Sequence, residues 1–191
     1  MVGPEIGCYL SHLAIWEKIA AGDAEGAVIL EDDFSCADDL ADVLQAVAQD
    51  QGDWDILKLF SARKGQKLLD ARPFSADREI AVPYKVPNTT LGYAIRRDSA
   101  ARLARDVIPV SRPIDEDHKH FWEMGLRIAL VSPPPLKFGE QSAETGTITA
   151  ARHHKSKQPI GAALRHGWRS LRFRIRYLFN LHWHRLVRKA R

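Results

Sequence analysis

The sequence has little cysteine and no long apolar run. Its 191 residues include two cysteines, Cys8 and Cys36, which excludes a disulfide-stabilised scaffold and indicates a reducing compartment. No uninterrupted apolar segment approaches the roughly 20 residues of a membrane-spanning helix. The first ten residues lack the charged start and apolar run of a signal peptide. We therefore expect a cytoplasmic protein.

Acidic residues are missing from the last part of the chain. Residues 151–191 contain 12 lysines and arginines and no aspartate or glutamate, whereas residues 1–150 contain 16 basic and 24 acidic residues. The net charge of +4 therefore conceals an acidic domain and a strongly basic tail. Each part needs its own explanation.

Apolar residues change between helical and strand spacing along residues 1–150, which predicts alternating helices and strands. The predicted helices cover residues 3–22, 39–48, 99–106 (capped by Asp98) and 115–125. The predicted strands cover residues 27–30, 54–60, 89–97 and 126–131. Residues 61–88 are predicted to form a long loop with a short hairpin. This alternation is typical of α/β layers around a mostly parallel sheet.

The stretch "AVILEDDF" (27–34) ends a buried strand in three adjacent carboxylates. In open α/β sheets, ligands bind beyond the carboxyl ends of the strands. Along an extended chain, Glu31 and Asp33 face one side and Asp32 faces the other. Two carboxylates on one side suit a hard divalent cation, which can neutralise a diphosphate. The alternative is a solvated turn or a capping cluster.

Five segments, in order, resemble glycosyltransferase family 25: "GPEIGCYLSHLAIWEKIA", "AVILEDDF", "WDILKLF", "TLGYAIRRDSAARL" and "PID". The Gly-Cys-x-x-Ser-His and Leu-Glu-Asp-Asp elements are the most specific, and the resemblance runs over about residues 3–143. This family contains lipopolysaccharide and lipooligosaccharide galactosyltransferases, with collagen galactosyltransferases as relatives. The resemblance implies a GT-A-like fold, a UDP-sugar donor, a Mn²⁺ or Mg²⁺ ion, a lipid-linked saccharide acceptor and inversion at the anomeric carbon.

The resemblance also implies roles for the acidic residues. The metal-binding element corresponds to residues 31–33, with Asp33 as principal ligand, Glu31 facing the same site and Asp32 assigned to the substrate. Asp115 in "RPIDEDH" matches the family's Pro-x-Asp element, and we expect it to be the general base. Glu116 and Asp117 are alternatives for that base, and an N-cap is an alternative role for Asp115.

Three further residues are candidate substrate contacts. His12 is expected to reach the nucleotide, with a hydrogen-bonded core histidine or a support for the carboxylate loop as alternatives. Gly92 indicates close approach to a ligand or to another element. For Tyr93, a position in the core is an equal alternative to a substrate contact. His118 and His120 have the wrong spacing for a two-histidine metal site, and Cys8 is expected to be a small hydrophobic residue.

Family members carry a strand-helix-strand region before the Gly-Cys-x-x-Ser-His helix, whereas this sequence opens at that helix. We therefore expect a GT-A-like α/β domain over residues 1–150, with a mixed, mostly parallel sheet flanked by helices and incomplete at its N-terminus. Residues 151–191 are expected to form a basic amphipathic helical tail.

The tail combines arginines with aromatic residues at helical spacing. The residues expected to contact a membrane are Arg165, Trp168, Arg169, Arg172 and Arg176. A cationic face beside an apolar face is typical of a helix on an anionic lipid surface, here the inner face of the cytoplasmic membrane. Docking on the acidic domain is an alternative, and nucleic acid is the least favoured partner.

Overall fold

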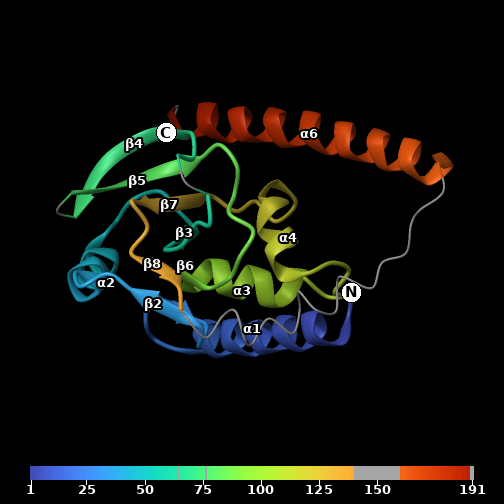
Figure 1. Ribbon diagram of the computed structural model, residues 1–191. Coiled ribbons are helices and arrows are strands. Elements are labelled where there is room, and N and C mark those ends of the chain that lie inside the picture. The colour runs from blue at the N-terminus through green and yellow to red at the C-terminus, as the bar shows by residue number, and fades with distance from the viewer. Residues whose placement is uncertain (64, 76, 140–159, 190–191) are drawn as a thin grey trace. The chain divides into compact units, whose positions relative to one another are not determined.

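The computed structural model describes residues 1–63, 65–75, 77–139 and 160–189. The chain forms two compact units, Met1–Thr147 and Ile148–Arg191. The first unit contains the strands and the shorter helices, and the second contains the long helix α6 (Ile160–Lys189). Figure 1 shows the order of these elements along the chain.

The first unit is built on a six-stranded mixed sheet with the order β1-β6-β3-β7-β5-β4. Its strands are β1 (Gly26–Leu30), β3 (Ile56–Lys58), β4 (Leu68–Ser75), β5 (Arg78–Pro83), β6 (Gly92–Arg96) and β7 (Ile128–Ser132). The α/β class is confirmed, but the expected mostly parallel arrangement is wrong. Among the described strands only β3 and β7 pair in parallel, because β6 runs antiparallel between β1 and β3.

The segment 61–88 explains this difference. It forms the β4–β5 hairpin, with strands of eight and six residues, instead of a loop with a short hairpin. The chain thus leaves β3 through a hairpin instead of a helical crossover, and it returns along β6 in the opposite direction. Parallel neighbours need a crossover connection, usually a helix, and the link from β3 to β6 has none.

A second, two-stranded sheet was not predicted. Strands β2 (Phe34–Cys36) and β8 (Leu136–Phe138) pair antiparallel directly after the acidic triplet. The pairing continues past β8, where the Gly139 N–H donates to the Asp33 carbonyl at 2.8 Å. A Cβ at Gly139 would lie only 3.0 Å from that carbonyl oxygen. The two-stranded sheet of β2 and β8 therefore fixes the backbone at Asp33.

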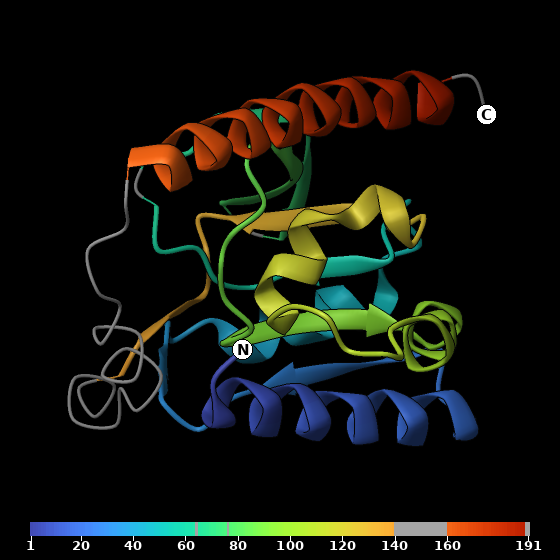
Figure 2. The same ribbon diagram turned by 90° about the vertical axis from the view of Figure 1, so that its right-hand side faces the viewer.

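Helices cover both faces of the six-stranded sheet. They are α1 (Gly3–Ala21), α2 (Leu40–Gln49), α3 (Arg97–Asp106), α4 (Ile114–Lys119) and the 3₁₀ turn η1 (Phe121–Glu123). Figure 2 shows α4 in front of the strands and α2 behind them. Two details differ from the sequence predictions. The helix expected over 115–125 divides into α4 and η1, and α3 begins at Arg97, so Asp98 lies in its first turn instead of capping it.

The alternation of side chains along β3 and β6 separates two cores. Leu57 and Ala94 enter a core with Val43 of α2. Their neighbours Lys58 and Tyr93 therefore point to the opposite face, where α1 and α4 pack. Lys58 and Tyr93 are also directly paired in the β3–β6 register, which brings their side chains together on that face.

Candidate functional site

Glu31 follows the last residue of β1, and the neighbouring strand β6 determines its surroundings. Its N–H donates to the Leu91 carbonyl at 3.0 Å, so Glu31 lies beside Thr90. The Thr90 hydroxyl donates to Glu31 Oε1, and His12 Nε2 lies 3.5 Å from the same oxygen. Burial alone would raise the pKa of Glu31, but His12, Thr90 and Lys58 together hold it below its ordinary value. Glu31 is therefore an anion that α1 and β6 keep in place.

Asp33 differs from its neighbours in that one carboxylate oxygen is buried without a partner. Asp33 Oδ1 accepts no hydrogen bond from any residue that the structure describes. Burial and the charges of Glu31 and Asp32 raise the pKa of Asp33, whereas Asp32 is exposed. A buried, unsatisfied carboxylate oxygen near a second carboxylate is the environment that a hard divalent cation stabilises. The residues present therefore fit the divalent ion implied by the resemblance.

His12 is held by a chain of buried aromatic residues. Trp16 Nε1 donates to the Tyr93 hydroxyl at 2.9 Å, and that hydroxyl lies 2.8 Å from His12 Nδ1. Tyr93 and Trp16 are fully buried. These bonds orient the imidazole so that Nε2 faces Glu31. The structure thus places His12 against the carboxylate and Tyr93 behind His12, while a direct contact of either residue with the substrate stays a prediction.

Gly92 is explained by close packing within the protein. A Cβ at Gly92 would lie 2.1 Å from Leu136 Cδ1 of β8 and 3.1 Å from Leu30 Cδ2 of β1. The glycine therefore permits the approach of another element, which was one of the two expectations. A contact of Gly92 with the substrate stays a prediction.

Sequence reasoning missed a buried lysine-histidine pair at the centre of the site. Lys58 Nζ donates to the Thr89 carbonyl at 2.8 Å and lies 2.7 Å from His118 Nδ1. Burial lowers the pKa of Lys58 to about 7, although Asp115 and Glu31 oppose this shift. Burial and Lys58 hold the pKa of His118 well below its ordinary value, so the imidazole is neutral. The available signal was a lysine inside the otherwise apolar run "ILKLF" (56–60).

The three candidate bases on α4 have different surroundings. Asp117 is buried and accepts hydrogen bonds from Tyr9 and Arg112, and Glu116 pairs with Lys119. Asp115 lies in the first turn of α4, and its charge acts on Lys58 and Cys8 at the site. Pro113 occupies the N-cap position, which contradicts the alternative N-cap role for Asp115.

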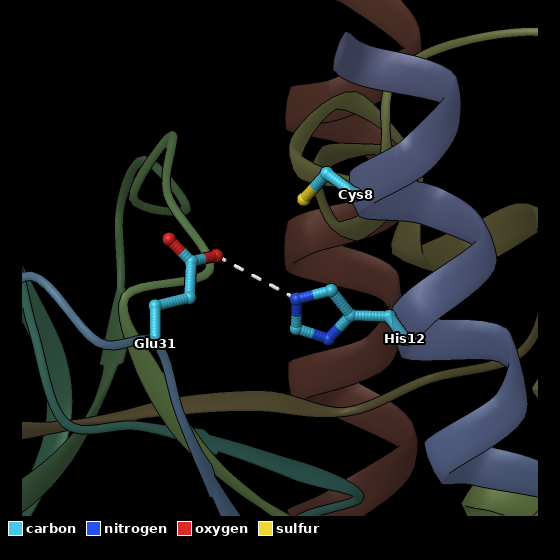
Figure 3. A group of neighbouring side chains, drawn as sticks. All are labelled: Cys8, His12 and Glu31. Atoms are coloured by element: carbon cyan, nitrogen blue, oxygen red, sulfur yellow. Dashed lines mark ion pairs between the residues drawn. The ribbon is translucent and has the colours of Figure 1, made fainter. Parts of the chain in front are cut away.

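Cys8 joins His12 and Glu31 in a compact group of metal-ligating side chains. Figure 3 shows Cys8 and His12 projecting from α1 toward Glu31. One ligand atom from each residue lies within 4.8 Å of the other two. Cys8 is half-buried, and burial together with Glu31 raises the pKa of its thiol.

The basic tail is described from residue 160 onward, as helix α6. Trp168, Arg172 and Arg176 are exposed, whereas the side chains of Arg165 and Arg169 lie outside the described set. Among the described residues, no helix has the length and apolar character needed to cross a membrane.

A surface hollow of about 470 Å³ lies at the opposite ends of the sheet strands. It is lined by charged residues that include Asp55, Arg96 and Arg127. Asp55 is bonded to Arg127, and the Arg96 guanidinium lies over the Trp54 ring at 4.0 Å. None of the predicted site residues lines this hollow.

Comparison with known proteins shows the class of protein to which this chain is similar. The chain is 28% identical to procollagen galactosyltransferase 1 of Danio rerio over 172 residues, which cover 77% of this chain and 28% of that protein. It is 32% identical to a glycosyltransferase 25 family member of Aedes aegypti over 117 residues, covering 59% and 19% of the two chains. It is 26% identical to the inactive glycosyltransferase 25 family member 3 of Homo sapiens over 152 residues, covering 69% and 24%.

The family follows from a profile match. The profile described as glycosyltransferase family 25 (LPS biosynthesis protein) matches residues 1–117, and the chain belongs to this family. The family prediction is confirmed, and the matched range contains His12, Glu31, Asp33 and Asp115. The chain spans less than a third of the length of the curated relatives described above.

Proposed function

We propose that this chain carries the donor site of a metal-dependent, inverting glycosyltransferase with a GT-A-like fold. It moves a hexose from a UDP-sugar to a saccharide acceptor. The observation that carries the proposal is the buried Asp33 Oδ1, which has no hydrogen-bond partner among the described residues and lies near the charge of Glu31, at the end of β1 in a chain of this family. Glu31 and Asp33 would hold Mn²⁺ or Mg²⁺, with Asp32 beside them.

The residues of the site have separate roles in this reaction. Inversion requires a single in-line displacement, in which a base takes the proton of the acceptor hydroxyl. Asp115 is the proposed base, since it matches the Pro-x-Asp element of the family and its charge acts on Lys58 and Cys8 at the site. The divalent ion, when bound, stabilises the charge of the departing diphosphate. His12 and Thr90 keep Glu31 ionised and oriented for that ion.

The donor and acceptor are proposed from the relatives. Galactose is the proposed sugar because the similar protein of Danio rerio described above is a procollagen galactosyltransferase. A lipopolysaccharide precursor is the proposed acceptor because the family is described as an LPS biosynthesis protein. The second candidate function is a non-catalytic family member, which is favoured by the relatives whose names describe them as inactive or probably inactive.

We also propose that α6 binds the anionic inner face of the cytoplasmic membrane. Its exposed apolar side chains include Trp168, Ile175 and Phe179, and Arg172 and Arg176 are exposed beside them. A helix with neighbouring apolar and cationic faces lies in the interface of an anionic bilayer. Such binding would place the chain near a lipid-linked saccharide.

Calorimetric titration of UDP into the 191-residue chain tests the donor site. We expect binding that requires Mn²⁺, is lost when the metal is chelated, and falls at least about tenfold in Asp33→Asn. Asp38→Asn is the matched control, because Asp38 is an exposed aspartate of the same segment. UDP binding that is independent of Mn²⁺ or unchanged in Asp33→Asn would contradict the proposed site. Absence of binding would favour the non-catalytic alternative.

A further inference from the structure

We propose that Cys8, His12 and Glu31 form a second cation site, selective for a thiophilic divalent ion such as Zn²⁺. This site shares Glu31 with the carboxylate site but draws its other two ligands from α1. Its occupation would therefore regulate the donor site. That last consequence rests on the proposed function, whereas the site itself does not.

The sequence of α1 places two of the ligands on one face of the helix. Cys8 and His12 are four residues apart, so their side chains lie one above the other. Glu31 reaches the same space from the end of β1, as Figure 3 shows. The site is therefore assembled by two rigid elements, a helix and a strand, that pack within the same unit.

The spacing of the ligand atoms matches a tetrahedral ion better than a hydrogen bond. His12 Nε2 and Glu31 Oε1 are 3.5 Å apart, which is longer than an ordinary hydrogen bond. Two nitrogen or oxygen ligands about 2.1 Å from a tetrahedral zinc ion lie about 3.4 Å from each other, and a sulfur ligand lies about 3.6 Å from either. All three ligand atoms are within 4.8 Å of one another, so a small rotation of the Cys8 side chain closes the site.

The donor set selects the kind of ion. A thiolate, an imidazole and one carboxylate favour Zn²⁺ over Mn²⁺ or Mg²⁺, which prefer oxygen ligands. Three protein ligands also leave a fourth position open. The thiol releases its proton to solvent on binding, and His12 Nδ1 lies 2.8 Å from the Tyr93 hydroxyl, the type of outer bond that orients a ligating histidine.

Sharing of Glu31 couples the two sites. A zinc ion held by Cys8, His12 and Glu31 occupies Glu31 Oε1 and adds a positive charge beside Asp33. Both effects weaken the binding of a second divalent ion at Glu31 and Asp33. Zinc would thus lower the affinity for UDP wherever that affinity depends on Mn²⁺.

Cobalt absorption spectroscopy of the 191-residue chain tests the new site without any nucleotide. We expect Co²⁺ to produce a thiolate-to-cobalt charge-transfer band together with the visible bands of four-coordinate cobalt, and Zn²⁺ to abolish both. The spectrum should persist in Cys36→Ser, because Cys36 is an exposed cysteine of β2 outside the cluster. It should be lost in Cys8→Ser, and Tyr93→Phe should weaken Co²⁺ binding by roughly 10- to 100-fold.

Two results would overturn the proposal. One is the absence of the charge-transfer band in the unmodified chain, and the other is its persistence in Cys8→Ser. The outcome is independent of the donor site, since Asp33→Asn should weaken Mn²⁺-dependent UDP binding at least about tenfold and keep the cobalt spectrum. If both sites exist, Zn²⁺ should reduce UDP binding in the unmodified chain and have little effect in Cys8→Ser.

Discussion

Lys58 connects two segments of the candidate site. Its fully buried ammonium contacts the Thr89 carbonyl, next to the threonine that holds Glu31. It also contacts His118 on α4, three residues after Asp115. Lys58 therefore links the segment that holds the proposed metal ligand to the helix that carries the proposed base.

The buried amine predicts how stability changes with pH. Lys58 has a pKa of about 7 in the folded chain, against 10.5 for an ordinary lysine, because burial disfavours its charge. Between these values the unfolded chain binds a proton that the folded chain does not, so stability rises with pH. We expect the free energy of unfolding, measured with urea, to increase by roughly 1 to 2 kcal/mol from pH 7 to pH 8.5.

Lys58→Met is the variant that isolates this contribution. Methionine is similar in length and carries no charge, so the variant should lose most of the increase between pH 7 and pH 8.5. Both proteins retain Cys8 and the other titrating groups, so their difference reports on Lys58 and on its effect on His118 and Glu31. An equal increase in the variant would show that Lys58 is not the group responsible.

At the scale of single residues, the sequence indicated the residues of a recognisable motif better than pairs that only the fold brings together. Glu31, Asp33 and His12 were predicted from a specific motif, and the structure brings Glu31 and His12 together. Lys58 and His118 were missed because they lie 60 residues apart in sequence, and only the β3–β6 register and the packing of α4 bring them together.

Among the elements, α6 has the most distinctive surface. Its exposed apolar side chains include Trp168, which is 69% exposed, and Phe179, which is 65% exposed. Arg172 and Arg176 are exposed one helical turn apart. The anionic membrane proposed above would cover the exposed apolar side chains and pair with the arginines.

Vesicle sedimentation tests the helix directly. We expect binding to vesicles that contain phosphatidylserine, weaker binding at high salt, and little binding to phosphatidylcholine alone. Replacing Arg172 and Arg176 by Gln should weaken binding by about 2 kcal/mol, or roughly 30-fold, because each basic residue contributes about 1 kcal/mol. Arg105→Gln is the control, because Arg105 is an exposed arginine of α3. Equal binding to neutral and anionic vesicles would contradict the electrostatic part of the proposal.

Element predictions were most accurate where the spacing of apolar residues was regular. Helix α1 begins at Gly3 as predicted, with the Glu5 side chain accepting the Val2 N–H. The ribbon of β2 and β8 was missed, since strands of three residues contain too little pattern to identify. The helix predicted over 115–125 ends early, at Lys119, and a 3₁₀ turn follows it.

For the first unit as a whole, Asp55 is the main polar connection between layers. Its buried carboxylate accepts hydrogen bonds from Ser99 at 2.7 Å, from Arg102 at 2.6 Å and from the Arg127 backbone and guanidinium at 2.7 Å each. These partners lie on α3 and on the segment that leads into β7. The network is at the opposite end of the strands from Glu31, beside the hollow of charged residues.

Asp55→Asn should therefore reduce stability and leave the site intact. Loss of the charge weakens the bonds of Asp55 to Arg102 and Arg127, whose side chains are partly exposed, and we expect the free energy of unfolding to fall by about 1 to 3 kcal/mol in urea titrations. Asp53→Asn is the matched control, because its ion pair with Arg127 is exposed and contributes about 1 kcal/mol or less. A loss of cobalt or UDP binding in folded Asp55→Asn would show that the two ends of the sheet are coupled.

Sheet topology was the least predictable property of the whole unit. Alternating helices and strands indicated the α/β class correctly, but strand direction depends on which strands become neighbours. The insertion of β6 between β1 and β3 is decided by packing between residues about 35 to 70 positions apart in sequence, not by local spacing.

The outer strand β4 has a consequence for the behaviour of the protein at high concentration. A regular edge strand offers unpaired N–H and C=O groups to any neighbouring molecule. The β4–β5 pairing instead has two register shifts, Asp70 has a positive φ of 51°, and Pro73 has no N–H to offer. A second molecule therefore finds no continuous row of donors along β4. This edge resists intermolecular sheet formation, the first step of fibrous aggregation.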